Sequence, residues 1–180
     1  MLYLQKPTLE DKEKYKDMIK EWQDFGGPYV PCIIDYDCNH LIDELDYNAV
    51  ISVVENYSKG KVFDYNINHF ECSDFYFIFD NDELIGMGEI RHNLKPLGKK
   101  TIGHIVCGIR PSKRKKGYGF HAMELMIEKL KNDNVSEIIL CHNAEDIISS
   151  KMIKSLGFCF KGSVFSEINN KEIMCYTKKI

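Results

Sequence analysis

Residues 101–160 alternate between strand and helix periodicity, and this alternation constrains the fold more than any other feature of the sequence. An apolar strand pattern over 101–109 precedes a helical pattern that begins near Tyr118, and a short apolar strand over 135–141 precedes a second helical pattern over 144–156. Such alternation is typical of an α/β domain. The strand at 135–141 has few polar gaps, as expected of a buried parallel strand.

The remaining chain completes one mixed α/β domain, which we place at residues 1–180. We expect a strand at 2–5, a helix from Thr8 to Gly26, a less regular helix from about Asn39 to Tyr57, a β-hairpin over 74–91, a loop over 93–100, and terminal strands at 158–165 and 172–178 around an Asn169-Asn170 turn. The predicted core faces of the two clearest helices are Tyr15, Met18, Ile19 and Trp22, and Ala122, Met123, Met126, Ile127 and Leu130.

Composition excludes several classes of protein. The chain is 44% hydrophobic and 28% charged, with a net charge of −3, whereas a dedicated nucleic-acid binder is more often basic. It has seven cysteines, an odd number, and no two of them have CxxC spacing. This pattern favours reduced thiols over disulfides or a zinc site. We find no signal peptide and no membrane-spanning stretch, so we expect a cytoplasmic protein without a metal.

A basic, glycine-containing turn lies between the strand that ends at Ile109 and the helix from Tyr118. Five of the seven residues from Arg110 to Lys116 are basic, and Gly117-Tyr118-Gly119 follows them. Outward-pointing backbone N–H groups and a helix N-terminus would form an anion site here. A phosphate, a nucleic acid or no ligand at all remain open readings, with a solvated charged face as the ordinary explanation.

Two standard phosphate loops do not match this turn. It lacks GxxxxGK[ST], and the third glycine of GxGxxG is replaced by Ala122. The string Arg114-Lys115-Lys116-Gly117-Tyr118-Gly119 instead resembles the (Q/R)xxGx(G/A) acetyl-CoA-binding motif of the GCN5-related N-acetyltransferase (GNAT) superfamily. The strand ending Ile109-Arg110-Pro111 and the later Leu156-Gly157-Phe158 are also similar to that family. GHIVCGIRPSKRKKGYG further resembles a bacterial subgroup of predicted acetyltransferases.

This resemblance implies the GNAT fold: a mixed, mostly antiparallel central sheet with a splayed parallel pair of strands, flanked by helices. It also implies that acetyl-CoA is the cosubstrate, with its pantetheine arm in the gap between the splayed strands. The implied cofactor-binding residues are Cys107, Ile109, Arg114, Lys115, Lys116, Gly117, Tyr118, Gly119, Phe120, Asp146 and Ser149. Lys113 is a further candidate for the 3′-phosphate.

The chain departs from the family pattern at two positions of the second helix. Asp146 stands where the family has asparagine, and Ile153 stands where it often has a tyrosine that protonates the leaving thiolate. Isoleucine cannot donate a proton, so another group, water or no acid at all must serve. Cys175 and Tyr176 are weak candidates for that acid.

A base must take a proton from the acceptor ammonium. Glu89, late in a predicted strand beside the acceptor, is the first candidate, and His104 is the second. A solvated carboxylate and a packed structural histidine are the ordinary explanations for these two residues. Tyr118 is more simply a ring that packs over the cofactor.

We therefore expect transfer of an acetyl group to a primary amine of a small molecule, a peptide N-terminus or a lysine. The carboxylates of the 28–75 segment hint at a cationic acceptor: Asp35, Asp37, Asp43, Glu44 and Asp46. The alternatives are a catalytically inactive CoA-binding regulatory module and a nucleic-acid-binding protein that uses the basic run. The resemblance is compatible with a homodimer, and no membrane or nucleic-acid partner is expected.

Overall fold

A computed structural model describes residues 1–26, 30–31, 46–62, 69–133, 135–167 and 170–180 of the chain. Its elements, in chain order, are β1 (Leu2–Gln5), η1 (Leu9–Asp11), α1 (Lys12–Phe25), α3 (Tyr47–Ser58), β2 (Cys72–Asp80), β3 (Glu83–His92), α4 (Gly98–Thr101), β4 (Ile105–Ile109), η2 (Pro111–Lys113), α5 (Tyr118–Asn132), β5 (Glu137–Asn143), α6 (Ile147–Ser155), β6 (Cys159–Ser166) and β7 (Lys171–Lys179). The α/β class and both predicted hairpins are confirmed.

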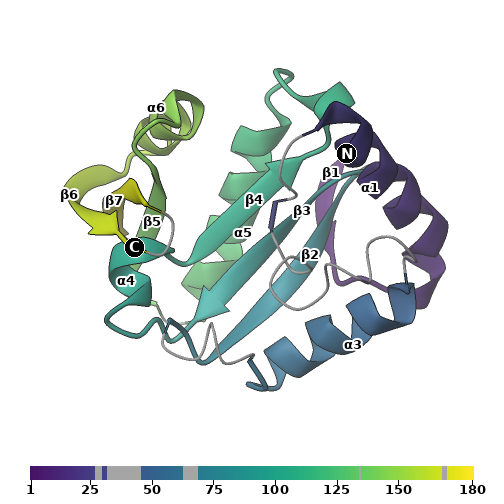
Figure 1. Cartoon of the computed structure of the whole chain (residues 1–180), viewed down its shortest axis with the longest axis horizontal. Helices are drawn as coiled ribbons and strands as arrows, with labels where there is room; N and C mark the ends of the chain where they lie inside the picture. The colour runs from purple at the N-terminus through teal and green to yellow at the C-terminus, as the bar shows by residue number, and fades with distance from the viewer. Residues whose placement is uncertain (27–29, 32–45, 63–68, 134, 168–169) are drawn as a thin grey trace.

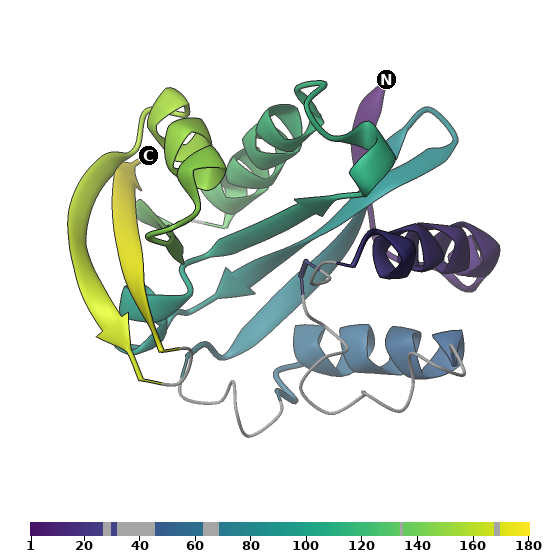
Figure 2. The same cartoon turned by 45° about the horizontal axis from the view of Figure 1, so that its top comes forward.

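An antiparallel sheet in the order β1-β2-β3-β4 forms the centre of the molecule. Phe75, Phe77 and Phe79 of β2 pack in one apolar cluster with α1 and α3, while Tyr76 and Ile78 belong to clusters that include α5. This alternation follows from the period of two along a strand. Helices α1 and α3 therefore cover one face of the sheet and α5 covers the other (Figure 2).

The ends of α1 follow from local chemistry. Thr8 and Asp11 form a capping box at the entry, and Gly26 ends the helix in the left-handed conformation, with φ of 73°. The predicted apolar face is confirmed: Tyr15, Met18, Ile19 and Trp22 are all buried. The predicted core face of α5 is buried in the same way.

Strands β5, β7 and β6 form a second antiparallel sheet, and here the sequence prediction was wrong. The expected single central sheet with a splayed parallel pair is not seen, because β5 takes its ladder hydrogen bonds from β7, antiparallel to it. The two sheets meet at an isolated bridge between Gly103 and Leu140, beside hydrogen bonds between His104 and Ile139. Beyond that bridge, β4 and β5 separate (Figure 1).

Three predicted boundaries also change. Residues 101–103 are not strand, because α4 occupies Gly98–Thr101 and Gly103 follows it with φ of 68°. Helix α3 begins after Asp46, whose carboxylate accepts from two backbone N–H groups, and the part predicted from Asn39 lies outside the described residues. Helix α6 begins after Asp146 for the same reason.

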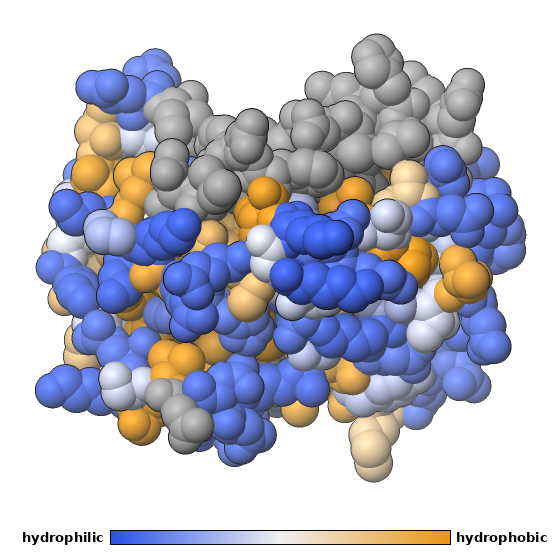
Figure 3. Space-filling model, turned by 90° about the horizontal axis from the view of Figure 1, so that it is seen from below, coloured by the Kyte–Doolittle hydropathy of each residue, from blue (hydrophilic) through white to orange (hydrophobic). Residues whose placement is uncertain are grey.

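The face of the molecule on the side of α3 is shown in Figure 3. Where its side chains are described, this face is mostly hydrophilic, with apolar residues in small patches. Among the described residues, no helix is long and apolar enough to cross a membrane.

Candidate active site

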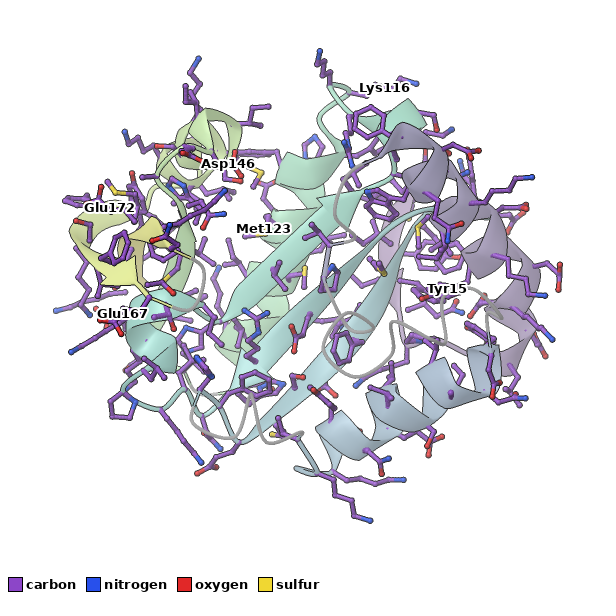
Figure 4. The ribbon with its side chains drawn as sticks, viewed as in Figure 1. Tyr15, Lys116, Met123, Asp146, Glu167 and Glu172 are labelled. Atoms are coloured by element: carbon purple, nitrogen blue, oxygen red, sulfur yellow. The ribbon has the colours of Figure 1, made fainter. Side chains whose placement is uncertain are left out.

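The predicted anion turn connects β4 to α5. After Ile109 the chain makes the single turn η2, Lys115 and Gly117 take positive φ values of 60° and 85°, and α5 begins at Tyr118. The first N–H groups of α5 have no partner one turn earlier in the helix, so they are available to an anion. Figure 4 shows Lys116 in this turn.

Most cations of the basic run are held by the protein itself. Arg110 Nε donates to Glu21 at 2.5 Å, Lys113 Nζ to Glu83 at 2.5 Å, Arg114 Nε to the Ile109 carbonyl at 2.9 Å, and Lys116 Nζ to the Ser112 carbonyl at 3.2 Å. Only Lys115 of the run makes no hydrogen bond or ion pair to a described residue. The run therefore serves first to hold the turn, and it offers less free charge than a nucleic-acid surface uses.

Glu21, on α1, is a functional candidate that sequence reasoning missed. One carboxylate oxygen accepts from Arg110, and the other accepts from the backbone N–H of Ser112 at 2.6 Å. Burial acts to raise the pKa of Glu21, but the hydrogen bonds from Ser112 and Arg110 together lower it. Glu21 thus fixes the start of the turn from a helix far away in sequence.

The edge of β4 opposite β3, with which no described strand pairs, faces the gap between the sheets. Arg91 N–H donates to the His104 carbonyl and Arg110 N–H to the Ile85 carbonyl, at opposite ends of the β3–β4 register. Because antiparallel partners alternate between hydrogen-bonded and open pairs, the backbone groups of Cys107 and Ile109 point away from β3. The resemblance to the GNAT family predicts that the pantetheine arm pairs with the backbone of residues 107–109, which includes these two positions.

A cavity of about 640 Å³ fills this gap. Its lining includes the whole of β4, part of β5 and α6, and side chains of β3, α3 and α5. Arg114, Asp146 and Ser149 lie among the lining residues, as do Glu89 and Ile153. The structure thus brings several predicted cofactor residues and the first candidate base to one cavity. Two of the lining residues, Asp146 and Met123, are labelled in Figure 4.

Asp146 and Ser149 hydrogen-bond to each other at the start of α6. The Asp146 carboxylate accepts from the Ser149 N–H at 2.9 Å and from its hydroxyl at 2.6 Å. The helix N-terminus is therefore capped by a carboxylate from its own chain. Ile153, one turn further along, is buried and lines the cavity with its apolar side chain.

Glu89 is not a solvated strand carboxylate. It is 4% exposed, and its Oε2 accepts from Arg91 Nε at 3.0 Å and lies 2.7 Å from Arg91 Nη2. Arg91 also donates to the Ile102 carbonyl at 3.2 Å and lies over the Phe70 ring. Sequence reasoning missed Arg91, although its position two residues after Glu89 places both side chains on one strand face.

His104 occupies a different position. It is buried, is absent from the cavity lining, and its Nδ1 accepts from the Ile139 N–H at 2.9 Å. Burial lowers its pKa to about 4. A neutral imidazole that bridges β4 and β5 is the structural role that this geometry favours.

The other aromatic candidates point elsewhere. Tyr118 donates its hydroxyl to Asp80 at 2.7 Å, and the Tyr176 hydroxyl lies 3.3 Å from Ser150 Oγ without lining the cavity. Phe120 packs partly buried against the core cluster that contains Met123. Within the described part of the chain, no group of three or more His, Cys, Asp or Glu side chains could hold a metal ion.

Three solved structures share the fold of this chain and are distant from it in sequence. The microcin C7 self-immunity acetyltransferase MccE, in complex with acetyl-CoA and AMP, is 14% identical with a TM-score of 0.65, over 99% of this chain and 92% of that one. Mycobacterium smegmatis RimJ, in complex with CoA-disulfide, is 12% identical with a TM-score of 0.73, over 99% and 81%. A Salmonella typhimurium acetyltransferase that modifies the N-terminal serine of ribosomal protein L7/L12 is 12% identical with a TM-score of 0.67, over 99% and 95%.

No protein of curated function matches the sequence at a significant level. The sequence model of the acetyltransferase (GNAT) family matches residues 39–158, which is more than half of the chain. The turn, the open edge of β4 and the cavity all lie within or against that segment. The chain belongs to the GNAT acetyltransferase family.

Proposed function

We propose that this protein is an acetyl-CoA-dependent N-acetyltransferase that acts on a primary amine. The observation that carries this proposal is one continuous cavity, bordered by Arg114 of the anion turn and by the buried Glu89. A two-substrate transfer needs its donor and its acceptor to meet in one space, with a base at the acceptor.

The donor fits the half of the cavity that is made of backbone. The N–H and carbonyl groups of Cys107 and the N–H of Ile109 would pair with the amides of the pantetheine arm, as an added strand pairs with a sheet edge, while the Ile109 carbonyl accepts from Arg114. Backbone N–H groups from Lys115 to Phe120 would hold the pyrophosphate, since the Arg114 N–H donates to the Pro111 carbonyl. Lys115 and Lys116 are the candidates for the 3′-phosphate, and Asp146 and Ser149 border the same space from α6.

Glu89 would act as the base. Among the described residues only Arg91 donates to it, and only at Oε2, so Oε1 is available to an ammonium or a bridging water. The neutral amine then attacks the thioester carbon, and a backbone N–H near Ile109 stabilises the oxyanion. Collapse of the tetrahedral intermediate expels the CoA thiolate.

The leaving thiolate has no obvious proton donor at the family's tyrosine position. Ile153 lines the cavity, and Tyr176 does not. A thiolate is a far better leaving group than an amine anion, so we propose that it departs without a dedicated acid and takes its proton from water. The acceptor is a primary amine of a small molecule or a peptide.

A CoA-binding module without catalysis is the second candidate, and Ile153 is the observation that favours it. The two candidates make the same prediction for cofactor binding and opposite predictions for turnover. Release of CoA on adding any member of an amine panel supports the enzyme, whereas binding without turnover across the panel supports the module.

Calorimetric titration with acetyl-CoA tests the shared part. Desulfo-CoA and 3′-dephospho-CoA are the matched controls for the thiol and for the phosphate. Micromolar binding that weakens without the 3′-phosphate places the cofactor on the basic turn. Absence of binding by all three ligands removes both candidates.

A further inference from the structure

Two cysteines face each other beside the cavity. Cys141 of β5 and Cys175 of β7 are direct partners in the antiparallel register, and their sulfur atoms lie 2.9 Å apart. Cys175 Sγ also lies 2.9 Å from the Lys100 carbonyl, to which it donates. We propose that this thiol pair is a modification site, at which a low-molecular-weight disulfide is reduced and an intramolecular Cys141–Cys175 disulfide is formed.

The strand register suits such a bond. Ala144 N–H donates to the Glu172 carbonyl in the β5–β7 ladder, so the hydrogen-bonded pairs fall on alternate residues and Cys141–Cys175 is an open pair. In an open pair the Cα atoms are about 4.5 Å apart and the side chains approach most closely. This separation lies within the range that a disulfide spans.

Access to the two thiols differs. Cys141 is half-buried and lines the cavity, whereas Cys175 is 6% exposed and does not line it. A reagent that enters the cavity therefore meets Cys141 before Cys175. Cys159 provides an internal comparison, because it is exposed on β6 and has no described sulfur within hydrogen-bonding distance.

The electrostatics favour Cys175 as the first thiolate, with Cys141 as its hydrogen-bond donor. The hydrogen bond to Cys175, followed by burial, raises the pKa of Cys141, and the same hydrogen bond lowers the pKa of Cys175. Lys161 acts to lower both pKa values, and Arg91 acts to lower that of Cys141. Once one proton is lost, the remaining S–H donates to the thiolate and stabilises it.

The exchange balances in two steps. The Cys175 thiolate takes the proton of Cys141 through their hydrogen bond, and Cys141 Sγ then attacks one sulfur of the reagent RSSR, forms the mixed disulfide Cys141–S–S–R and expels RS⁻, which takes that proton back from Cys175. Cys175 thiolate then attacks Cys141 Sγ, forms the Cys141–Cys175 bond and expels the second RS⁻. The two protons of the protein thiols pass to the two leaving thiolates, so RSSR gains two electrons and yields two RSH.

Peptide mapping of the native full-length chain tests the site. After incubation with oxidised glutathione, we expect a Cys141–Cys175 cross-link with loss of two hydrogens, reversed by dithiothreitol, while Cys159 carries a glutathione adduct. Cys175→Ala should trap the adduct on Cys141, and Cys141→Ala should leave Cys175 unmodified. A wild-type map in which Cys159 is modified but no Cys141–Cys175 link is present overturns the proposal. The proposal also fails if Cys175 in Cys141→Ala is modified as fast as Cys141 in Cys175→Ala.

A second arm separates two sources of the reagent and rests on the proposed function. If the cavity binds CoA, CoA disulfide should oxidise the pair about tenfold faster than oxidised glutathione, because binding positions the disulfide. Acetyl-CoA should then slow the reaction at Cys141 and not at Cys159. Equal rates, with the cross-link still formed, support the thiol pair and count against CoA binding in the cavity.

Discussion

The two ends of the cavity are built from different parts of the chain. At the turn between β4 and α5, the groups that face the space are backbone N–H and carbonyl groups, and the nearby cations are mostly held by Glu21, Glu83 and backbone oxygens. At the other end the groups are side chains, the Glu89–Arg91 pair among aromatic rings. One end is therefore set by the local conformation of the chain, and the other by which side chains the fold brings together.

This difference has a chemical consequence. A backbone site binds any ligand with the right phosphates and amides, which suits a cosubstrate common to a whole family. A side-chain site changes with a few substitutions, which suits an acceptor that differs among relatives. If the two ends of the cavity are separable, a substitution at one end should leave the role of the other end unchanged.

The largest effect is expected at the acceptor end. Glu89→Gln keeps an acceptor for Arg91 but removes the proposed base, so the turnover rate should fall about 10²- to 10⁴-fold. Affinity for acetyl-CoA should stay within about twofold, because the interaction that is lost is made only during reaction. Steady-state kinetics and calorimetry measure the two quantities, with Glu71→Gln on the exposed surface as the control. A turnover rate that is unchanged at every pH would show that a group other than Glu89 is the base.

The same division explains what the sequence could predict. Gly117, Gly119 and the strand–turn–helix order define the turn locally, so its residues were found without a structure. Glu21 was missed because its partners depend on tertiary contacts, whereas the spacing of Glu89 and Arg91 on one strand face was a local signal for their ion pair. Glu21 contacts Arg110 and Ser112, which lie 89 and 91 positions further along the chain. The parallel pair was predicted wrongly because β5 has the apolar composition of a strand buried on both faces, and composition does not reveal which partner takes its hydrogen bonds.

His104 joins the two strands where the cavity closes, and its effect should appear in stability. Its pKa is about 4 in the folded protein and about 6.5 when unfolded, so the unfolded chain binds more protons between these values. Stability should therefore fall by about 3 kcal/mol as pH decreases from roughly 6.5 to 4. His104→Asn retains an acceptor for the Ile139 N–H and should lose most of this dependence.

Urea unfolding at several pH values measures the His104 effect, with exposed His121→Asn as the matched control. Equal acid sensitivity of His104→Asn and the wild type would show that the imidazole is not held neutral. A loss of turnover that exceeds the loss of folded protein would restore His104 as a candidate base.

At the cofactor end, Gly119→Ala should separate binding from folding. An added Cβ would lie 3.8 Å from Ile109 and from Met152, which is ordinary contact, so the protein itself has room for it. Alanine also favours the helix, so thermal stability should be unchanged or slightly higher. A phosphate that approaches the backbone closely has no such room, and CoA affinity should fall about tenfold.

Gly117→Ala, two residues before Gly119, is the contrasting variant. Its φ of 85° is unfavourable for alanine, so it should lose about 1 kcal/mol of stability even though the site around its Cβ is open. If Gly119→Ala binds CoA as tightly as the wild type, the pyrophosphate does not lie on the start of α5, and the backbone description of this end fails.

The smallest effect should come from Lys115, the cation of the basic run that has no hydrogen bond or ion pair to a described residue. Lys115→Ala should weaken CoA binding about threefold, as expected of an exposed ion pair, and should leave binding of 3′-dephospho-CoA unchanged. Lys113→Ala is the control, because Lys113 is already paired with Glu83 at 2.5 Å. The difference between the two ligands should shrink as salt is raised, since exposed charges are screened. If both variants weaken both ligands equally, the basic run acts only through its overall field, and no single lysine reads the 3′-phosphate.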